Sequence, residues 1–151
     1  EGTVFISVTD TDKPAATQLA GRFHDLGFEV LATGGTAQAI SRMGIPVRAI
    51  NKISEGSPHV VDLIRSGEVD LVINTPTGSG ARSDGYEIRT AAVRHGIPCV
   101  TTMTGASAAA RAIFAARSAA RSEPRSLQEL HGLSGAAGDE RGDALGAVEA
   151  P

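Results

Sequence analysis

The sequence predicts an α/β fold in which helices cover both faces of a five-stranded parallel sheet. Short apolar runs alternate with segments of helical character, and the connections between them are short. Aromatic residues make up only 3% of the 151 residues, so the core must be built from Val, Ile, Leu and Ala. Strands that are buried on both faces of a parallel sheet have this aliphatic composition.

The predicted strands are apolar runs bounded by turn residues or helix signals. They cover residues 4–8, 28–32, 47–50, 69–73 and 97–101. Asp12 is a suitable N-cap for a first helix that stops at Gly27, and a second, short helix stops at Gly44. Pro58 suits the first position of a third helix, which ends near Gly67.

The second half of the chain continues the same alternation. Residues 74–82 are polar and Gly-rich, and we interpret them as a loop. Asp84, with Glu87 three residues later, fits a capping box and predicts that the next helix begins there and ends at Gly96. Residues 106–120 are rich in Ala and Arg and are predicted to be helical by propensity.

The predicted domain covers residues 1–131. A second capping-box pattern at residues 126–129 predicts a short last helix that ends near His131. Residues 132–151 consist mainly of Gly, Ala and acidic residues without periodicity, and they are predicted to form a disordered tail. Because the chain begins with Glu1 and not with Met, we expect it to be part of a longer protein.

Composition excludes several classes of function. The formal net charge of -3 argues against a general nucleic-acid binder or a membrane-surface binder. No apolar run approaches the roughly 20 residues that span a membrane. A single cysteine, Cys99, cannot form an intrachain disulfide. With no visible signal peptide, these features predict a cytoplasmic protein that binds neither nucleic acid nor membrane.

The most informative motif is Thr33-Gly34-Gly35-Thr36, which follows the second predicted strand and opens a helix. Two glycines allow a sharp bend and a close approach of the backbone to a ligand. The helix presents unpaired N–H groups and the positive end of its dipole, and two threonine hydroxyls add donors. The motif therefore predicts a phosphate site, although a Gly-Gly pair is also common in turns that bind nothing.

Polar side chains follow the other predicted strands too, and ligands in such folds bind at the carboxyl ends of the strands. Lys13 and Lys52 can converge on the glycine turn and neutralise a phosphate, or they can be solvated surface lysines. Asn74, Thr75 and Thr77 offer neutral hydrogen bonds to a sugar or base. The strand ends carry no nucleophile with a histidine partner and no His/Cys cluster, which indicates binding without catalysis and without a cofactor.

Several segments match the pattern of a known family when they are taken together. They are Ile6-Ser7-Val8 with Asp12-Lys13, Ala32-Thr33-Gly34-Gly35-Thr36-Ala37, Asn51-Lys52-Ile53-Ser54-Glu55-Gly56, Pro58-His59 and Ile73-Asn74-Thr75. With these segments the chain resembles the methylglyoxal-synthase-like domain, and more narrowly the C-terminal allosteric domain of the carbamoyl-phosphate synthase large subunit. The Thr-Gly-Gly-Thr element is shared across the superfamily, whereas the Asn-Lys-x-x-Glu-Gly-x-Pro-His stretch points to the synthase.

The resemblance implies a Rossmann-like three-layer sandwich that binds a nucleotide effector, UMP or in some members IMP. Residues expected to hold the effector phosphate are Lys13, Thr33, Gly35, Thr36 and Lys52. Residues expected to face the nucleoside are Ser7, Asn74, Thr75 and Thr77. Thr101 lies where some members bind ornithine, an activator. Pro76 departs from the family pattern, which has a hydroxyl residue at that position.

For the parent protein, the resemblance implies ATP-dependent synthesis of carbamoyl phosphate from bicarbonate and ammonia, for the pyrimidine and arginine pathways. The remaining domains of the large subunit would bind ATP with Mg or Mn, and a glutaminase small subunit would supply the ammonia. The parent is expected to be an oligomer. The chain described here would regulate this synthesis and catalyse nothing by itself.

Two other functions stay open. A free-standing methylglyoxal-synthase-like lyase would need a placed carboxylate to move protons. Methylglyoxal synthases typically carry Gly-Gly-Asp after the third strand and Asp-Pro after the fourth. The corresponding segments here are Glu55-Gly56-Ser57 and Asn74-Thr75-Pro76, so Glu55 is the acid expected nearest the site. In the third interpretation the chain is an assembly module whose Arg-rich helix makes oligomer contacts.

Overall fold

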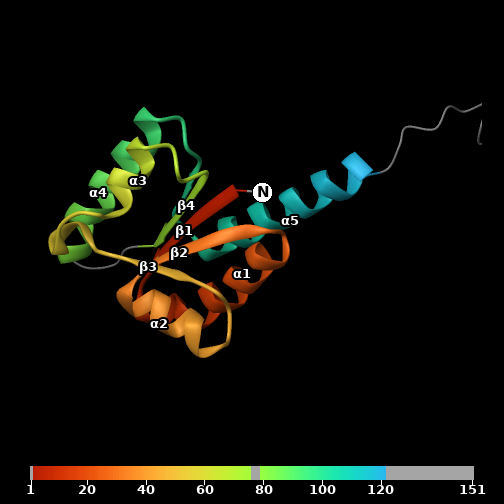
Figure 1. The fold of residues 1–151 in the computed structure, drawn as a ribbon, viewed down its shortest axis with the longest axis horizontal. Helices are drawn as coiled ribbons and strands as arrows, with labels where there is room; N and C mark the ends of the chain where they lie inside the picture. Colours follow the sequence, from red (N-terminus) through yellow and green to blue (C-terminus); the bar gives the residue numbers. More distant parts are fainter. Residues whose placement is uncertain (1, 76–78, 122–151) are drawn as a thin grey trace, which may run out of the picture. The chain divides into compact units, whose positions relative to one another are not determined.

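The structure, a computed structural model, describes residues 2–75 and 79–121. The chain divides into two compact units, Glu1–Arg117 and Ser118–Pro151, and only residues 118–121 of the second unit are described. The first unit contains a five-stranded, all-parallel sheet with the strand order β3-β2-β1-β4-β5. Figure 1 labels the first four of these strands. The strands are β1 (Gly2–Val8), β2 (Phe28–Thr33), β3 (Arg48–Ile50), β4 (Leu71–Thr75) and β5 (Cys99–Val100). The predicted α/β class is confirmed.

Helices alternate with the strands along the described part of the chain. They are α1 (Lys13–Asp25), α2 (Gly34–Arg42), α3 (Val60–Arg65), α4 (Ser79–Arg94) and α5 (Met103–Arg121), with short 3-10 turns η1 (Asp10–Asp12) and η2 (Ile53–Glu55). The strand order reverses direction at β1, because β2 lies on one side of β1 and β4 on the other. Open parallel sheets bind ligands at such a reversal, outside the carboxyl ends of the strands.

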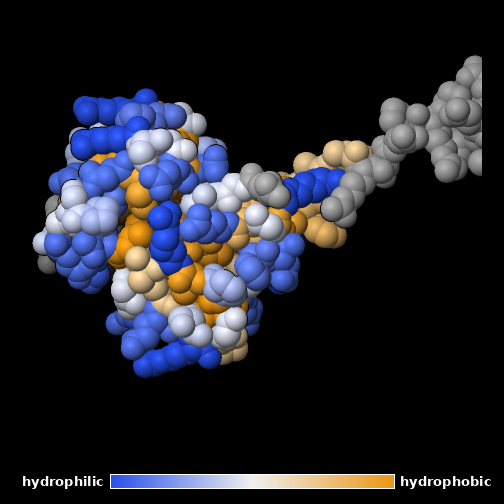
Figure 2. All heavy atoms as spheres, viewed as in Figure 1, coloured by the Kyte–Doolittle hydropathy of each residue, from blue (hydrophilic) through white to orange (hydrophobic). Residues whose placement is uncertain are grey.

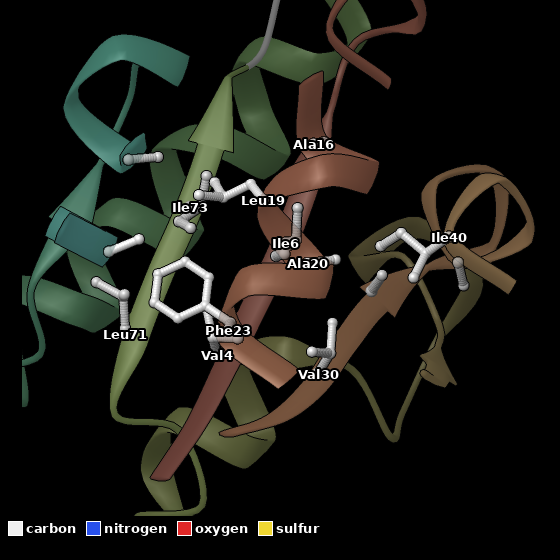
Figure 3. Packing of buried hydrophobic residues seen from close by; sticks show 14 residues of the cluster. Val4, Ile6, Ala16, Leu19, Ala20, Phe23, Val30, Ile40, Leu71 and Ile73 are labelled. Atoms are coloured by element: carbon white, nitrogen blue, oxygen red, sulfur yellow. The ribbon is translucent and has the colours of Figure 1, made fainter. Parts of the chain in front are cut away.

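Side chains that alternate along β1 separate the core into two layers. Val4 and Ile6 pack with α1, α2 and α5 on one face of the sheet, and Figure 3 shows them beside Leu19 and Phe23 of α1. Phe5 points to the other face and packs with α3 and α4. Each of these aliphatic or aromatic side chains contributes about 1.5–3 kcal/mol when it is fully buried. The sheet therefore lies between two helical layers and is packed on both faces.

The surface of the first unit is mixed in character. In the face seen in Figure 2, hydrophilic residues cover most of the surface and apolar residues are exposed between them. Among the residues whose side chains the structure describes, the exposed large apolar ones are Met43, Tyr86, Val93 and Phe114. Of the helices in the described ranges, none combines the length and apolarity that a membrane crossing would require.

Boundaries in the fourth βα unit differ from the prediction, and β4 begins at Leu71 and not at Val69. β4 runs to Thr75, so Asn74 and Thr75 belong to a strand that pairs with β1 and not to a loop. α4 begins at Ser79, well before the predicted start at Asp84. Asp84 and Glu87 therefore lie inside the helix, where residues three apart share a helix side without capping an end. A pair of acidic residues three apart is thus compatible both with a helix start and with a helix interior.

α3 begins later than predicted. Pro58 precedes the helix, and His59 is its N-cap with extended backbone angles. His59 forms an isolated parallel bridge with Asn51, which keeps the chain extended until Val60. The His59 N–H donates to Oδ2 of Asp62 at 3.1 Å, so Asp62 supplies the cap. The helix predicted to end near residue 131 and the tail predicted at 132–151 lie outside the described residues.

Candidate functional site

A cavity of about 850 Å³ lies at the carboxyl ends of β1, β2 and β4. Its walls come from the loop after β1, the first turn of α2, the segment after β3, and parts of α3 and α4. The lining residues are Ser7, Val8, Thr9, Asp10, Thr11, Lys13, Thr33, Gly35, Thr36, Asn51, Lys52, Ile53, Ser54, Val60, Asn74, Asp84, Gly85 and Ile88. Most of the residues predicted to hold a phosphate or a nucleoside are thus brought to one cavity.

The side chain of Lys13, the first residue of α1, reaches the glycine turn at the start of α2. An ideal Cβ on Gly35 would lie 3.1 Å from Nζ of Lys13, so the absence of a side chain at Gly35 makes room for the ammonium group. The first turn of an α-helix leaves backbone N–H groups without intrahelical partners, and its dipole end is positive. The ammonium and the helix end therefore favour an anion at the same place.

Hydroxyl groups surround the same turn. Thr33 is the N-cap of α2, but among the described residues its hydroxyl makes no capping bond. Its Oγ1 lies instead 3.2 Å from Oγ of Ser7 in β1. The N–H of Val8 donates to Oγ1 of Thr36 at 3.4 Å, which ties β1 to α2. Because a hydroxyl can both donate and accept, these groups keep hydrogen-bonding capacity for a ligand.

Lys52 reaches the cavity from the segment after β3. Its backbone N–H donates to Oε2 of Glu55 at 2.8 Å, and Nδ2 of Asn51 donates to the carbonyl of Gly56 at 3.1 Å. These bonds fix the backbone at Lys52 and not its side chain, which is exposed and can follow a ligand. Lys13 and Lys52 are the only lysines among the 151 residues, and both line the cavity.

Asp10 brings a carboxylate into contact with Lys13. Its Oδ1 lies 2.6 Å from Nζ of Lys13. The hydrogen bond from Lys13 and the charge of Lys13 lower the pKa of Asp10 below its usual 3.8, and the charge of Lys52 lowers it further. Asp10 and both lysines therefore line one cavity, and Asp10 is in contact with Lys13.

Asn74 contributes a buried amide to the cavity. The residue is 4% exposed, and its Nδ2 donates to the carbonyl of Ser7 at 3.4 Å. Its Oδ1 has no hydrogen-bond partner among the described residues. A buried acceptor left without a partner costs about 1–3 kcal/mol, so a ligand that donates an N–H or O–H here would gain affinity.

The other predicted contacts lie elsewhere. Thr75 is buried and its hydroxyl donates to Oδ2 of Asp12 at 2.7 Å, outside the described lining of the cavity. Asp12 is the N-cap residue of α1, as predicted, but its carboxylate does not cap that helix. Thr101 is exposed beyond edge strand β5, so an ornithine contact there would belong to a separate site. Thr77 lies outside the described residues.

The sequence did not indicate the wall formed by α4. Asp84, Gly85 and Ile88 line the cavity from within this helix, whereas the prediction rested on residues that follow strands. Residues four apart share a helix face, so the spacing of Asp84 and Ile88 was the available signal. Glu55, the acid expected nearest the site, instead accepts the bond from Lys52 and is not in the described lining.

The described residues contain no group of three or more His, Cys, Asp or Glu side chains that would hold a metal ion. The donors around the cavity are ammonium groups, hydroxyls, an amide and a helix N-terminus. This set suits a phosphate with a polar organic group attached, because phosphate oxygens accept hydrogen bonds and carry negative charge.

Comparisons with known proteins show which family the chain resembles. Residues 15–101 match the family model of the MGS-like domain. The chain is 50% identical over 140 residues to the carbamoyl phosphate synthase large chain of Gemmatimonas aurantiaca, a match that covers 91% of this chain and 12% of that protein. It is 54% identical over 114 residues to the carbamoyl phosphate synthase large chain, C-terminal section, of Methanopyrus kandleri, which covers 75% of this chain and 21% of that protein. The chain thus spans only a small part of these relatives.

The fold also agrees with a solved structure. The crystal structure of methylglyoxal synthase from Elizabethkingia anophelis NUHP1 superposes with a TM-score of 0.60 at 18% identity, and the match covers 73% of this chain and 77% of that one. At this identity the likeness concerns the fold alone. The resemblance expected from the motifs is confirmed by the family model, whose match extends over more than half of the chain. This chain therefore belongs to the MGS-like domain family, and it is similar to a segment of carbamoyl phosphate synthase large chains.

Proposed function

We propose that this chain is the allosteric domain of a carbamoyl phosphate synthase large chain and that its cavity binds a nucleoside monophosphate, UMP or IMP. The observation that carries the proposal is the position of Lys13 Nζ beside Gly35 at the N-terminus of α2. A phosphate at this point would receive backbone N–H groups, threonine hydroxyls and the charge of both lysines. The names of the relatives support the choice of parent enzyme.

The rest of the cavity supports a nucleoside beyond the phosphate. Pockets for small molecules enclose about 300–1,000 Å³, and this cavity of about 850 Å³ leaves room past the glycine turn. The acceptor Oδ1 of Asn74 would take a donor from the sugar or base. Ser7, the residue of β1 that pairs with Asn74 of β4, lines the same cavity and offers a hydroxyl.

In the parent enzyme, other domains of the large chain would bind ATP with Mg or Mn and make carbamoyl phosphate in the cytoplasm for pyrimidine and arginine synthesis. A glutaminase small subunit would supply the ammonia, and the parent would be an oligomer. Effector binding would act through a coupling free energy, typically about 1–3 kcal/mol. Because the chain spans 12% of the Gemmatimonas relative, that coupling would pass through residues of the large chain beyond this segment.

Calorimetric titration of the chain with UMP, IMP and inorganic phosphate at low salt tests the proposal. We expect saturable binding of at least one nucleotide, tighter than that of phosphate, because the sugar and base add contacts. Lys13→Gln should weaken binding of both kinds of ligand. Arg22→Gln is the matched control, since Arg22 is exposed in the last turn of the same helix. Equal affinity for nucleotide and phosphate would leave an anion site but contradict a nucleotide site.

The alternative is a methylglyoxal-synthase-like lyase, and two carboxylates favour it. Asp10 and Asp84 line the cavity, and proton transfer beside a phosphate-bearing triose needs a carboxylate base. Lys13 lowers the pKa of Asp10, which makes that carboxylate a weaker base. We therefore expect no methylglyoxal above background when the chain is incubated with dihydroxyacetone phosphate. Formation that depends on Asp84 would replace the allosteric proposal with the lyase.

A further inference from the structure

Asp10 forms an ion pair with Lys13, the lysine that a ligand phosphate would need. Its Oδ1 is 2.6 Å from Nζ of Lys13, a short charge-assisted contact. The same ammonium group lies 3.1 Å from the ideal Cβ position of Gly35. The ammonium group of Lys13 thus lies close both to the carboxylate of Asp10 and to the N-terminus of α2. A phosphate bound at this turn must share Lys13 with Asp10 or displace Asp10 from it.

The two partners of this ion pair differ sharply in exposure. The side chain of Lys13 is 28% exposed, whereas that of Asp10 is 92% exposed. The Lys13 side chain is therefore mostly surrounded by protein, while that of Asp10 is mostly in contact with water. Exposed ion pairs are weak, so exchanging Asp10 for a stronger anion costs little. The arrangement keeps the lysine in the site and lets the carboxylate leave it.

Both lysines of the chain act on Asp10. The hydrogen bond and charge of Lys13 and the charge of Lys52 favour the ionised carboxylate and lower its pKa. These are the same two residues that we propose to neutralise the ligand phosphate. Asp10 is thus the anion in contact with Lys13 at this end of the cavity.

We propose that Asp10 is an internal competitor for the anion site, bound to Lys13 in the free chain and displaced by a phosphate monoester. This inference rests on the proposed function and specifies the ligand group. A ligand carboxylate that displaced Asp10 would replace one singly charged group at Lys13 by another, so the exchange would add little binding free energy. A phosphate monoester near neutral pH carries almost two charges and three strong acceptor oxygens. Asp10 therefore raises the ligand concentration at which the site fills and selects dianionic phosphates over carboxylates.

Removing the competitor should strengthen anion binding. We expect Asp10→Asn to bind inorganic phosphate and UMP about two- to fivefold more tightly than the unmodified chain, as the size of an exposed ion pair suggests. Asp25→Asn is the matched control, because it changes the net charge equally from the exposed end of α1. It should leave both affinities unchanged. In a Lys13→Gln background the gain from Asp10→Asn should vanish, since the competition is for that lysine.

Other results of the titration would overturn the inference. Equal affinities for Asp10→Asn and Asp25→Asn would mean that Asp10 does not compete. Weaker binding by Asp10→Asn would mean that Asp10 positions Lys13 for the ligand. Binding of no anion by either the unmodified chain or Asp10→Asn would remove the site altogether. If phosphate binds more tightly to Asp10→Asn while UMP binds to neither protein, the nucleotide function fails and the competitor role stands.

A second measurement needs no ligand. NMR titration of the Asp10 carboxyl carbon should give a pKa below the usual value in the unmodified chain. The pKa should rise towards the usual value in Lys13→Gln, where the ion pair is lost. An equal pKa of Asp10 in the two proteins would show that the pair does not form in solution, and the inference would be wrong whatever the chain binds.

Discussion

The hydroxyl of Thr75 donates a 2.7 Å hydrogen bond to Oδ2 of Asp12, and this bond joins the sheet to the start of α1. Thr75 ends β4, and Asp12 directly precedes Lys13. Oγ1 of Thr9 donates to the same carboxylate oxygen at 3.2 Å. The loop between β1 and α1 is therefore fixed by one bond to the sheet and by one bond within the loop. The position of Lys13 at the glycine turn depends on this loop.

Removing the Thr75 hydroxyl should affect both stability and binding. We predict that Thr75→Val lowers the free energy of unfolding by about 1 kcal/mol, because the buried hydrogen bond to Asp12 is lost. The same variant should weaken phosphate binding, because Lys13 loses the support of its loop. Thr75→Ser keeps the hydroxyl and should behave like the unmodified chain in urea unfolding and in calorimetry. If the Val and Ser variants unfold at the same urea concentration, the bond contributes nothing to stability.

Lys52 should contribute through its charge. We predict that Lys52→Ala weakens nucleotide binding several-fold, within the roughly 1 kcal/mol that an exposed ionic contact supplies. Lys52→Arg should lose less, because the positive charge is kept. Arg65→Ala removes an equal charge from the exposed last turn of α3 and serves as the control. Calorimetric affinities that are the same for all these proteins would remove Lys52 from the site.

The strand ends of the site could be predicted because a parallel sheet aligns them. Once Ser7 and Asn74 are placed at the ends of neighbouring strands, their pairing in β1 and β4 follows from the sheet. The glycine turn after β2 carries its own local signal, and Gly35 indeed lies beside an ammonium group. Local patterns were therefore sufficient to predict the part of the cavity that lies at the strand ends.

The rest of the cavity depends on contacts that a local pattern does not contain. The start of α3 is decided by the bridge between His59 and Asn51, which overrides the preference of Pro58 for the first helical position. Asp84 lies inside α4 although it fits a capping box, because the same spacing occurs at helix starts and within helices. The ion pair of Asp10 with Lys13 needs the tight turn η1 between them, which the sequence did not indicate.

Phe23 should be among the most sensitive core positions. It is fully buried, and its ring packs edge-to-face on Phe28 with centroids 5.4 Å apart. We predict that Phe23→Ala lowers the free energy of unfolding by about 3–5 kcal/mol, because the change leaves a cavity between α1 and the sheet. Phe114→Ala is the same substitution at a side chain that is 63% exposed, and it should change stability by less than about 0.5 kcal/mol. Urea unfolding of the two variants would measure the difference, and similar losses would contradict the core placement of Phe23.

The charge of Asp62 links stability to pH at the start of α3. Its Oδ2 accepts a 2.7 Å bond from Oγ of Ser57 and a 3.1 Å bond from the N–H of His59. The bond from Ser57, followed by the bond from His59, lowers the pKa of Asp62 below its usual 3.8. The folded chain therefore binds this proton less tightly than the unfolded chain does. The resulting stabilisation is complete above the usual pKa of the unfolded chain and is lost as the pH falls through the lower folded pKa.

We predict that Asp62→Asn reduces the loss of stability on acidification. The amide oxygen of Asn can still accept the bonds from Ser57 and His59, but the side chain no longer takes up a proton. Between about pH 5 and pH 3, the unmodified chain should therefore lose more unfolding free energy than Asp62→Asn does. The urea midpoint at each pH measures this difference, and Asp25→Asn, an exposed carboxylate of α1, should follow the unmodified chain. Equal losses in the unmodified chain and Asp62→Asn would mean that the cap at α3 does not depend on the charge of Asp62.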